Sequence, residues 1–92
     1  MNRLSMFSEA KRRLGDLYER YPEASVVVSM QNQLDYLIQI ESGESTDRSR
    51  LKEIVLGVQT AREIEPRDEE TAAFMYEVTD AVQEMIRLTP AR

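Results

Sequence analysis

The sequence predicts an all-α protein, a small antiparallel four-helix bundle, in which residues 1–92 form a single helical domain. Apolar residues recur at steps of three and four along four segments, which is the spacing of amphipathic helices. The few glycines and prolines fall mostly where these segments end. No alternating run is long enough to form a sheet. Amphipathic helices joined by short connections favour an antiparallel bundle.

The first predicted helix runs from about Ser5 to Tyr21. Pro22 ends it, because the residue before a proline is disfavoured in helical conformation. Gly15 lies inside the helix at a cost of about 1 kcal/mol relative to alanine. Either the helix simply tolerates a glycine at this position, or a neighbouring helix approaches it closely. The face predicted to be buried comprises Phe7, Ala10, Leu14, Leu17 and Tyr21.

The second predicted helix runs from about Glu23 to Glu41. The β-branched run 26–28 alone would suit a strand. The residues that follow keep the helical period without a turn signal, so a helix is preferred. Gly43 closes it, because glycine readily adopts the left-handed conformation found after a helix.

The third predicted helix begins at Thr46 or Asp47, either of which could cap it through a side-chain oxygen. It ends near Glu65, before Pro66. The apolar stripe of this helix comprises Leu51, Ile54, Val55, Val58 and Ala61.

The fourth predicted helix is capped by Asp68, carries negative charge in its first turn, and stops before Pro90. It has two apolar stripes. Two stripes are typical of a helix at the centre of a bundle, and also of a helix with a second contact surface for a partner or a dimer mate. The first comprises Ala72, Met75, Tyr76, Thr79, Val82 and Ile86, and the second Phe74, Val78, Ala81 and Met85.

The composition disfavours an enzyme. The chain has no cysteine and no histidine, so thiolate nucleophiles, zinc sites built on sulfur and the commonest general base are absent. It has neither a phosphate-binding glycine loop nor the spacing of a calcium loop. The sequence therefore predicts a protein that binds another protein, with no catalytic residues, no cofactor and no metal.

Net charge and hydropathy limit the classes of partner and the cellular compartments that are expected. A net charge of −5 disfavours nucleic acid as a partner. No apolar run approaches the roughly 20 residues that cross a membrane. Three basic residues at 11–13 interrupt any N-terminal signal core, so a cytoplasmic protein is expected. A basic protein surface is the partner most compatible with this charge.

The acidic charge is concentrated near the C-terminal end. Residues 63–84 contain eight acidic residues and one basic residue, Arg67, for a net charge of −7. This stretch could be a solvated helix face with capping residues or an electrostatic contact surface. The second interpretation predicts partner binding through carboxylates, with Phe74 or Tyr76 as an aromatic anchor. The predicted partner-binding residues are Glu69, Glu70, Phe74, Tyr76, Glu77, Asp80 and Glu84.

The middle of the chain resembles a known family over about residues 20–70. The matching residues are Arg20-Tyr21-Pro22, Gln33-Leu34 with Tyr36, Asp47-Arg48-Ser49 with Leu51, Leu56-Gly57, Glu63, Glu65, Asp68 and Glu70. Their order and spacing resemble those of the small type VI secretion immunity proteins that neutralise an NAD(P)-hydrolysing (glycohydrolase) toxin. The resemblance implies a cytosolic helical protein that binds a toxin domain, blocks its nucleotide-binding cleft, and has no catalytic residues.

Two functions follow as expectations. The first is an antitoxin that binds and occludes a cognate toxin domain consuming NAD(P) or another nucleotide. The poorly matched fourth helix would then contact the toxin, since such surfaces are expected to vary with the toxin. The second is a small helical adaptor or chaperone that homodimerises through Phe74 and Met85. The matched residues also have structural explanations: Asp47 as a cap, Leu34 and Leu51 as core, and Gly57 as a close helix approach.

Overall fold

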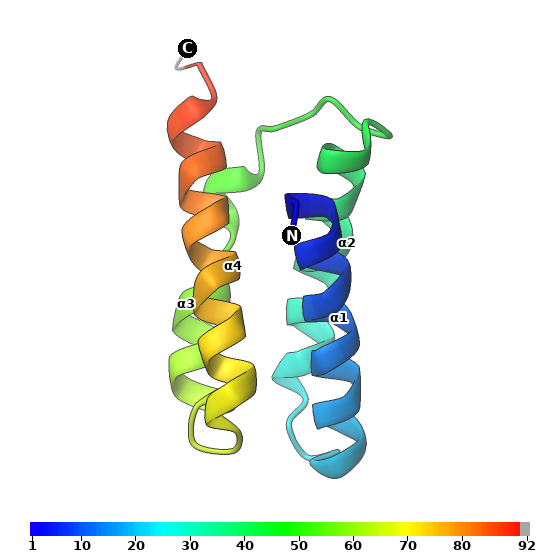
Figure 1. The fold of residues 1–92 in the computed structure, drawn as a ribbon, viewed down its shortest axis with the longest axis vertical. Helices are drawn as coiled ribbons and strands as arrows, with labels where there is room; N and C mark the ends of the chain where they lie inside the picture. The colour runs from blue at the N-terminus through cyan, green and yellow to red at the C-terminus, as the bar shows by residue number, and fades with distance from the viewer. Residues whose placement is uncertain (91–92) are drawn as a thin grey trace.

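The computed structural model describes residues 1–90, and in this part of the chain the regular structure is entirely helical. The long helices are α1 (Arg3–Arg20), α2 (Val26–Ser42) and α4 (Glu69–Leu88). Between α2 and α4 lie the 3-10 turn η1 (Leu51–Glu53), the short helix α3 (Leu56–Gln59) and the π-helix η2 (Thr60–Ile64). Figure 1 shows α1 beside α2, and α4 beside the segment formed by α3 and η2. The predicted all-α bundle is confirmed.

Helix α1 follows the prediction closely. Its first turn is capped by Asn2, whose side-chain oxygen accepts a hydrogen bond from the Ser5 amide at 2.8 Å. Gly15 faces the side chain of Gln31, and a Cβ atom there would lie 3.5 Å from the amide nitrogen of Gln31. That distance is ordinary van der Waals contact, so simple tolerance explains this glycine. The fully buried residues of α1 are Phe7, Ala10, Leu14 and Leu17.

Helix α2 begins three residues later than predicted. After Pro22 the chain forms a turn, in which the Ala24 amide donates to the carbonyl of Tyr21 at 2.9 Å. Ala24 is buried, so the turn belongs to the core. The β-branched run is helical, as predicted. Gly43 ends the helix in the left-handed region, with φ of 86°.

The continuous third helix was wrongly predicted. Residues 44–50 form a connection without helix, η1 is one turn, and the chain is extended at Ile54 (φ −68°, ψ 128°) before α3 begins. Asp47 caps a turn and not a helix, because its Oδ1 accepts a hydrogen bond from the Ser49 amide at 3.0 Å. The helical conformation predicted for this segment is confined to residues 56–64.

Side chains of α2 explain this break, because they satisfy backbone groups that a helix would have used itself. The hydroxyl of Tyr36 donates to the carbonyl oxygen of Asp47 at 2.7 Å and accepts from the amide of Arg50 at 3.3 Å. Further along, Oε1 of Gln33 accepts a hydrogen bond from the amide of Val55 at 2.9 Å. Three backbone groups of residues 47–55 are therefore paired with α2, and the local bonds that remain close only the single turn η1.

The stripe predicted for the third helix is also partly wrong. Leu51 is buried, whereas Val55 and Val58 are 49% and 56% exposed. Ile54 is half-buried and Ala61 is exposed. The break at residues 54–55 changes the register, so that the buried residues of α3 and η2 are Leu56, Thr60 and Ile64.

Helix α4 is central in the bundle and contacts α1, α3, η1 and η2. Its cap is Asp68, as predicted, with Oδ1 accepting from the Thr71 amide at 3.1 Å. The two apolar stripes are explained by this central position, because Val78 and Met85 of the second stripe are as buried as Met75 and Val82 of the first. On the α3 side, Gly57 allows a close approach, since a Cβ there would lie 3.2 Å from Cγ2 of Thr79.

Candidate partner-binding surfaces

The outer side of α4 carries the five carboxylates predicted to bind a partner, and all are exposed. They are Glu69, Glu70, Glu77, Asp80 and Glu84. Glu84 lies 3.8 Å from the guanidinium of Arg87. Within residues 1–90, the other four have no basic side chain within 4.0 Å. We call these five carboxylates the acidic α4 surface.

The acidic α4 surface is a single face of the helix. Residues 70, 77 and 84 are seven apart and therefore lie along one row. This row borders α1, because Phe74 lies one helical turn from residues 70 and 77 and contacts Arg13 of α1. Asp80 lies one turn after Tyr76, on the other flank. The structure thus places the predicted carboxylates on one face of α4, since Asp80 lies one turn from both Glu77 and Glu84, with Phe74 on one flank and Tyr76 on the other.

The two predicted aromatic anchors are already engaged within the chain. The guanidinium of Arg13 lies 4.3 Å from the centre of the Phe74 ring and donates to Glu9 at 2.9 Å. Tyr76 is half-buried, and burial raises the pKa of its hydroxyl, with a smaller contribution from Glu65. The carboxylates are consequently the accessible part of this side of α4, and the two aromatic rings pack within the chain beside them.

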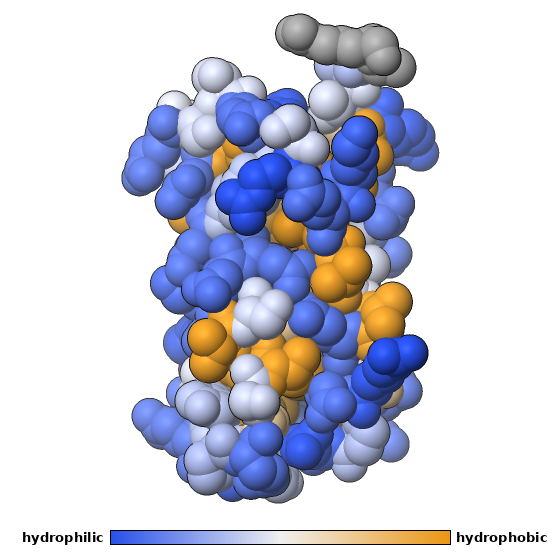
Figure 2. All heavy atoms as spheres, turned by 180° about the vertical axis from the view of Figure 1, so that it is seen from behind, coloured by the Kyte–Doolittle hydropathy of each residue, from blue (hydrophilic) through white to orange (hydrophobic). Residues whose placement is uncertain are grey.

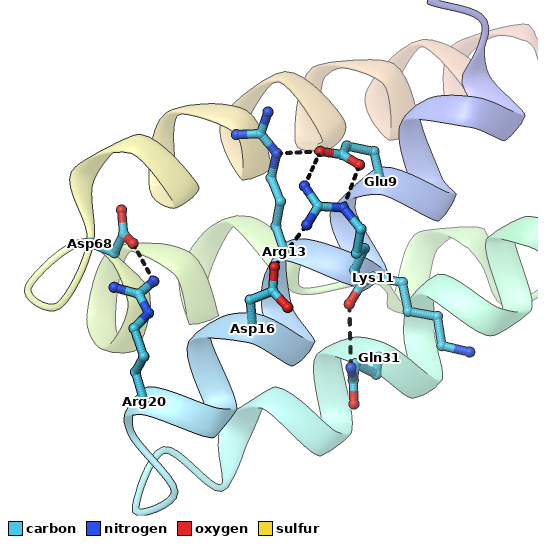
Figure 3. Close-up of polar contacts among 8 residues, drawn as sticks. Glu9, Lys11, Arg13, Asp16, Arg20, Gln31 and Asp68 are labelled. Atoms are coloured by element: carbon cyan, nitrogen blue, oxygen red, sulfur yellow. Dashed lines mark hydrogen bonds and ion pairs between the residues drawn. The ribbon is translucent and has the colours of Figure 1, made fainter.

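Ion pairs on α1 neutralise much of the charge on that neighbouring helix (Figure 3). Glu9 accepts hydrogen bonds from Arg12 and Arg13, which together lower the pKa of its carboxyl group to about 2. At the end of α1, Arg20 donates to Oδ2 of Asp68 at 2.6 Å and joins α1 to the cap of α4. The carboxylates of the acidic α4 surface lie outside these pairs.

The face formed by α2 and α3 exposes apolar side chains (Figure 2). Val28 is 48% exposed, comparable to Val55 and Val58. A hydrogen-bonded chain joins Ser29, Gln59 and Gln33 on this face, with the Gln33 amide donating to Gln59 at 2.7 Å. Gln33, Tyr36 and Asp47 are among the residues that carry the family resemblance over 20–70. Each makes hydrogen bonds that stabilise the fold, which supports a structural explanation of that resemblance.

The sequence analysis missed a groove at the C-terminal end of α4. The groove occupies about 740 Å³ between residues 46–52 and the last turn of α4. Three basic residues at alternate positions, 48, 50 and 52, were the signal in the sequence. Apart from the resemblance, in which Arg48 takes part, the sequence analysis assigned these residues no role. The residues that line the groove are Thr46, Asp47, Arg48, Ser49, Leu51, Lys52, Ile86, Thr89 and Pro90.

Within residues 1–90, no three acidic side chains lie close enough to hold a metal ion. In that same part of the chain, no helix is both long enough and apolar enough to span a membrane.

Comparison with known proteins identifies the family. The family model described as Tsi6 matches residues 3–86. No curated protein and no solved structure matches the chain. The family match extends well beyond the resembling stretch 20–70 and includes both α1 and α4. The chain therefore belongs to the Tsi6 family of type VI secretion immunity proteins.

Proposed function

We propose that this protein is an antitoxin that binds the catalytic domain of a cognate type VI-secreted toxin and occludes its active site. The observation that carries the proposal is the family match over residues 3–86. Membership of an immunity family implies a role in binding and not in catalysis. The resemblance over residues 20–70 supports a toxin that consumes NAD(P) or another nucleotide, in which case the cytoplasm is the compartment to be protected.

The acidic α4 surface is the proposed contact with the toxin. A cleft that binds the phosphates of a nucleotide presents cationic side chains and N–H donors. Exposed carboxylates can occupy the same groups, and they attract a basic cleft over a distance. Such attraction raises association rates by roughly 10–10³-fold at low salt. Glu69, Glu70, Glu77 and Asp80 are suited to this role because they have no ion-pair partner within residues 1–90.

Co-expression tests the function. Growth of cells that express the toxin domain should be restored by this protein, and their NAD(P) pool should be preserved. The purified protein should inhibit the purified toxin domain in a stoichiometric manner. If the protein neither restored growth nor formed a complex with the toxin domain, these results would contradict the antitoxin function. Rescue with a toxin that leaves NAD(P) intact would keep the function and change the toxin's substrate.

Charge reversal tests the surface. The double variant Glu77→Lys/Asp80→Lys should bind the toxin at least about tenfold more weakly at low ionic strength, because two attractive contacts become repulsive. The matched control is Glu19→Lys/Glu53→Lys, which changes the net charge equally at exposed positions outside α4. Equal affinities of the two double variants would assign the contact to another face.

The homodimeric adaptor gains no support from the structure. Its expected interface uses Phe74 and Met85. Met85 is 1% exposed, and the ring of Phe74 is covered by Arg13. Neither side chain offers an apolar surface for a second copy.

A further inference from the structure

Basic side chains are distributed unequally between paired and unpaired positions. Seven of them lie within 4.0 Å of a carboxylate: Arg3, Lys11, Arg12, Arg13, Arg20, Arg67 and Arg87. The others in residues 1–90 are Arg48, Arg50, Lys52 and Arg62. Three of these four fall within five residues of one connection. An acidic chain that pairs most of its cations thus keeps a basic cluster at one end of the bundle.

The connection that carries these cations is held in place. Tyr36 bonds both the Asp47 carbonyl and the Arg50 amide, and the Arg50 guanidinium lies 4.8 Å from the centre of the Tyr36 ring. Arg48 donates to Oγ1 of Thr89 at 3.3 Å and so joins the connection to the end of α4. Ordered cations lose less conformational entropy when they bind a ligand.

The carboxylate that lines the groove beside these cations, Asp47, is bound to its own turn. Asp47 accepts hydrogen bonds from Ser49, which lower the pKa of its carboxyl group. Its Oδ1 is directed to the Ser49 amide at 3.0 Å and not to Arg48 or Lys52. The positive charge of these two residues therefore remains available to an external anion.

The shape of the groove suits a polypeptide segment. Arg48 and Lys52 line it together with Thr46, Ser49 and Asp47, whose carboxylate is bound to the Ser49 amide, and Leu51 and Ile86 add apolar surface. A smaller hollow of about 260 Å³ shares Arg48, Thr89 and Pro90 with the groove. The two hollows adjoin at Arg48, Thr89 and Pro90 and are partly open to solvent, which leaves room for an extended chain.

We propose that this groove receives an acidic segment of the toxin protein, as a second contact separate from the acidic α4 surface. This inference rests on the proposed antitoxin function. Guanidinium, ammonium and hydroxyl groups bind carboxylates through charge-assisted hydrogen bonds, and Leu51 and Ile86 provide contact for an adjacent apolar side chain. The net charge of −5 disfavours nucleic acid as the occupant.

The two contacts together would set the orientation of the complex. Figure 1 shows the 43–50 connection near the C-terminal end of α4, whereas Glu69 and Glu70 lie in its first turn. A helix of 20 residues is about 30 Å long. Only Glu69 and Glu70 are separated from the basic groove by about that length, because the acidic α4 surface continues along the helix to Glu84. The opposite charges at the two ends of α4 disfavour the reversed orientation of the partner, because like charges would then meet at those ends.

Single charge reversals with a matched control test the groove. Lys52→Glu removes an exposed cation without an ion pair from the groove, and Arg62→Glu makes the same change on η2, away from it. Binding of each full-length variant to the toxin domain should be measured at low and high ionic strength. Lys52→Glu should weaken binding by at least about fivefold at low ionic strength, and Arg62→Glu by less than about twofold. Equal effects of the two variants would overturn the groove as a contact.

A compensating reversal identifies the occupant. Substitution of lysine for acidic residues of the toxin, one at a time, should include one variant that restores binding to Lys52→Glu and weakens binding to the wild-type protein. If no such variant restored binding, the proposal that an acidic segment of the toxin occupies the groove would be overturned. If the wild-type protein does not bind the toxin at all, the antitoxin function itself fails. If the wild type binds and Lys52→Glu binds equally well, only the groove fails.

The Lys52→Glu variant also tests two other possible occupants of the groove. Light scattering of the free protein shows whether it self-associates. Self-association that Lys52→Glu abolishes would overturn the proposal in favour of a second copy of this chain. Sedimentation with phosphatidylserine vesicles tests a membrane surface, and retention that Lys52→Glu abolishes would overturn the proposal in favour of anionic lipid.

Discussion

The hydroxyl group of Tyr36 donates a hydrogen bond to the carbonyl oxygen of Asp47 at 2.7 Å. This bond joins α2 to the connection that follows it and holds the basic residues of the groove. The same hydroxyl accepts from the amide of Arg50, so one side chain satisfies two backbone groups. Tyr36 is 7% exposed, and water has little access to replace either bond.

We expect Tyr36→Phe to destabilise the protein. The change removes the hydroxyl and leaves the Asp47 carbonyl and the Arg50 amide without their partner. The free energy of unfolding should fall by roughly 1–3 kcal/mol, as measured by urea denaturation. Amide exchange should become faster at residues 47–50. Tyr18→Phe is the control, because Tyr18 is half-exposed. Equal stability of Tyr36→Phe and the wild type would show that the hydroxyl does not order the connection.

Two glycines should respond in opposite directions to replacement by alanine. Gly15→Ala should raise the free energy of unfolding by roughly 0.5–1 kcal/mol, because alanine favours the helix and its Cβ meets Gln31 at an ordinary 3.5 Å. Gly57→Ala should lower it by roughly 1 kcal/mol, because its Cβ meets Cγ2 of Thr79 at 3.2 Å. Thr79 cannot easily withdraw, since its hydroxyl donates to the carbonyl of Met75 at 3.1 Å.

The double variant Gly57→Ala/Thr79→Ser checks the cause. Serine keeps the hydroxyl and removes the methyl group that Cβ would meet, so stability should recover relative to Gly57→Ala. If the double variant is no more stable than the single one, the loss does not arise from this contact.

Thr60 carries a polar atom with no partner in the structure. Its side chain is 0% exposed and Oγ1 has no hydrogen bond within residues 1–90. Thr60→Val keeps the shape and removes the unpaired hydroxyl, so it should raise the free energy of unfolding by about 1 kcal/mol. Thr79→Val is the comparison and should give no gain, because that hydroxyl is bonded. A loss of stability in Thr60→Val would indicate that the hydroxyl has a partner, such as a buried water.

The Arg20–Asp68 pair should make stability depend on pH in the acid range. Arg20 and the Thr71 amide lower the pKa of Asp68 below its ordinary value of 3.8. The carboxylate therefore contributes stability above pH 3.8, and this contribution is lost as the pH falls through the lower folded-state pKa. Asp68→Asn should flatten this part of the curve, since the amide oxygen still caps Thr71 but carries no charge.

Asp80→Asn is the control for that experiment. Asp80 is exposed and has no basic side chain within 4.0 Å in residues 1–90. Its substitution should change the pH profile of stability less than Asp68→Asn does. A profile that Asp68→Asn and Asp80→Asn flatten equally would assign the acid sensitivity to general charge repulsion and not to the pair with Arg20.

The sequence by itself determined those features that depend on neighbours along the chain. The buried face of α1 was predicted correctly except for Tyr21, which is half-buried and follows the helix as its C-cap. The left-handed Gly43 and the cap formed by Asp68 were also predicted correctly. Each depends on contacts within about one helical turn or on the repeat of one helix, which local sequence encodes. The exposure of the acidic residues on α4 followed from the same periodicity.

Tertiary structure alone decided the third segment and the state of the candidate site. Apolar period and a capping residue predicted a helix from 46 or 47, but Tyr36 and Gln33 take its backbone groups from 11 and 22 positions away. Phe74 was predicted as a free anchor, yet Arg13 covers it from another helix. Hydrogen bonds and ring contacts between distant residues depend on how the helices pack, and no local pattern records which side chain will reach which backbone group.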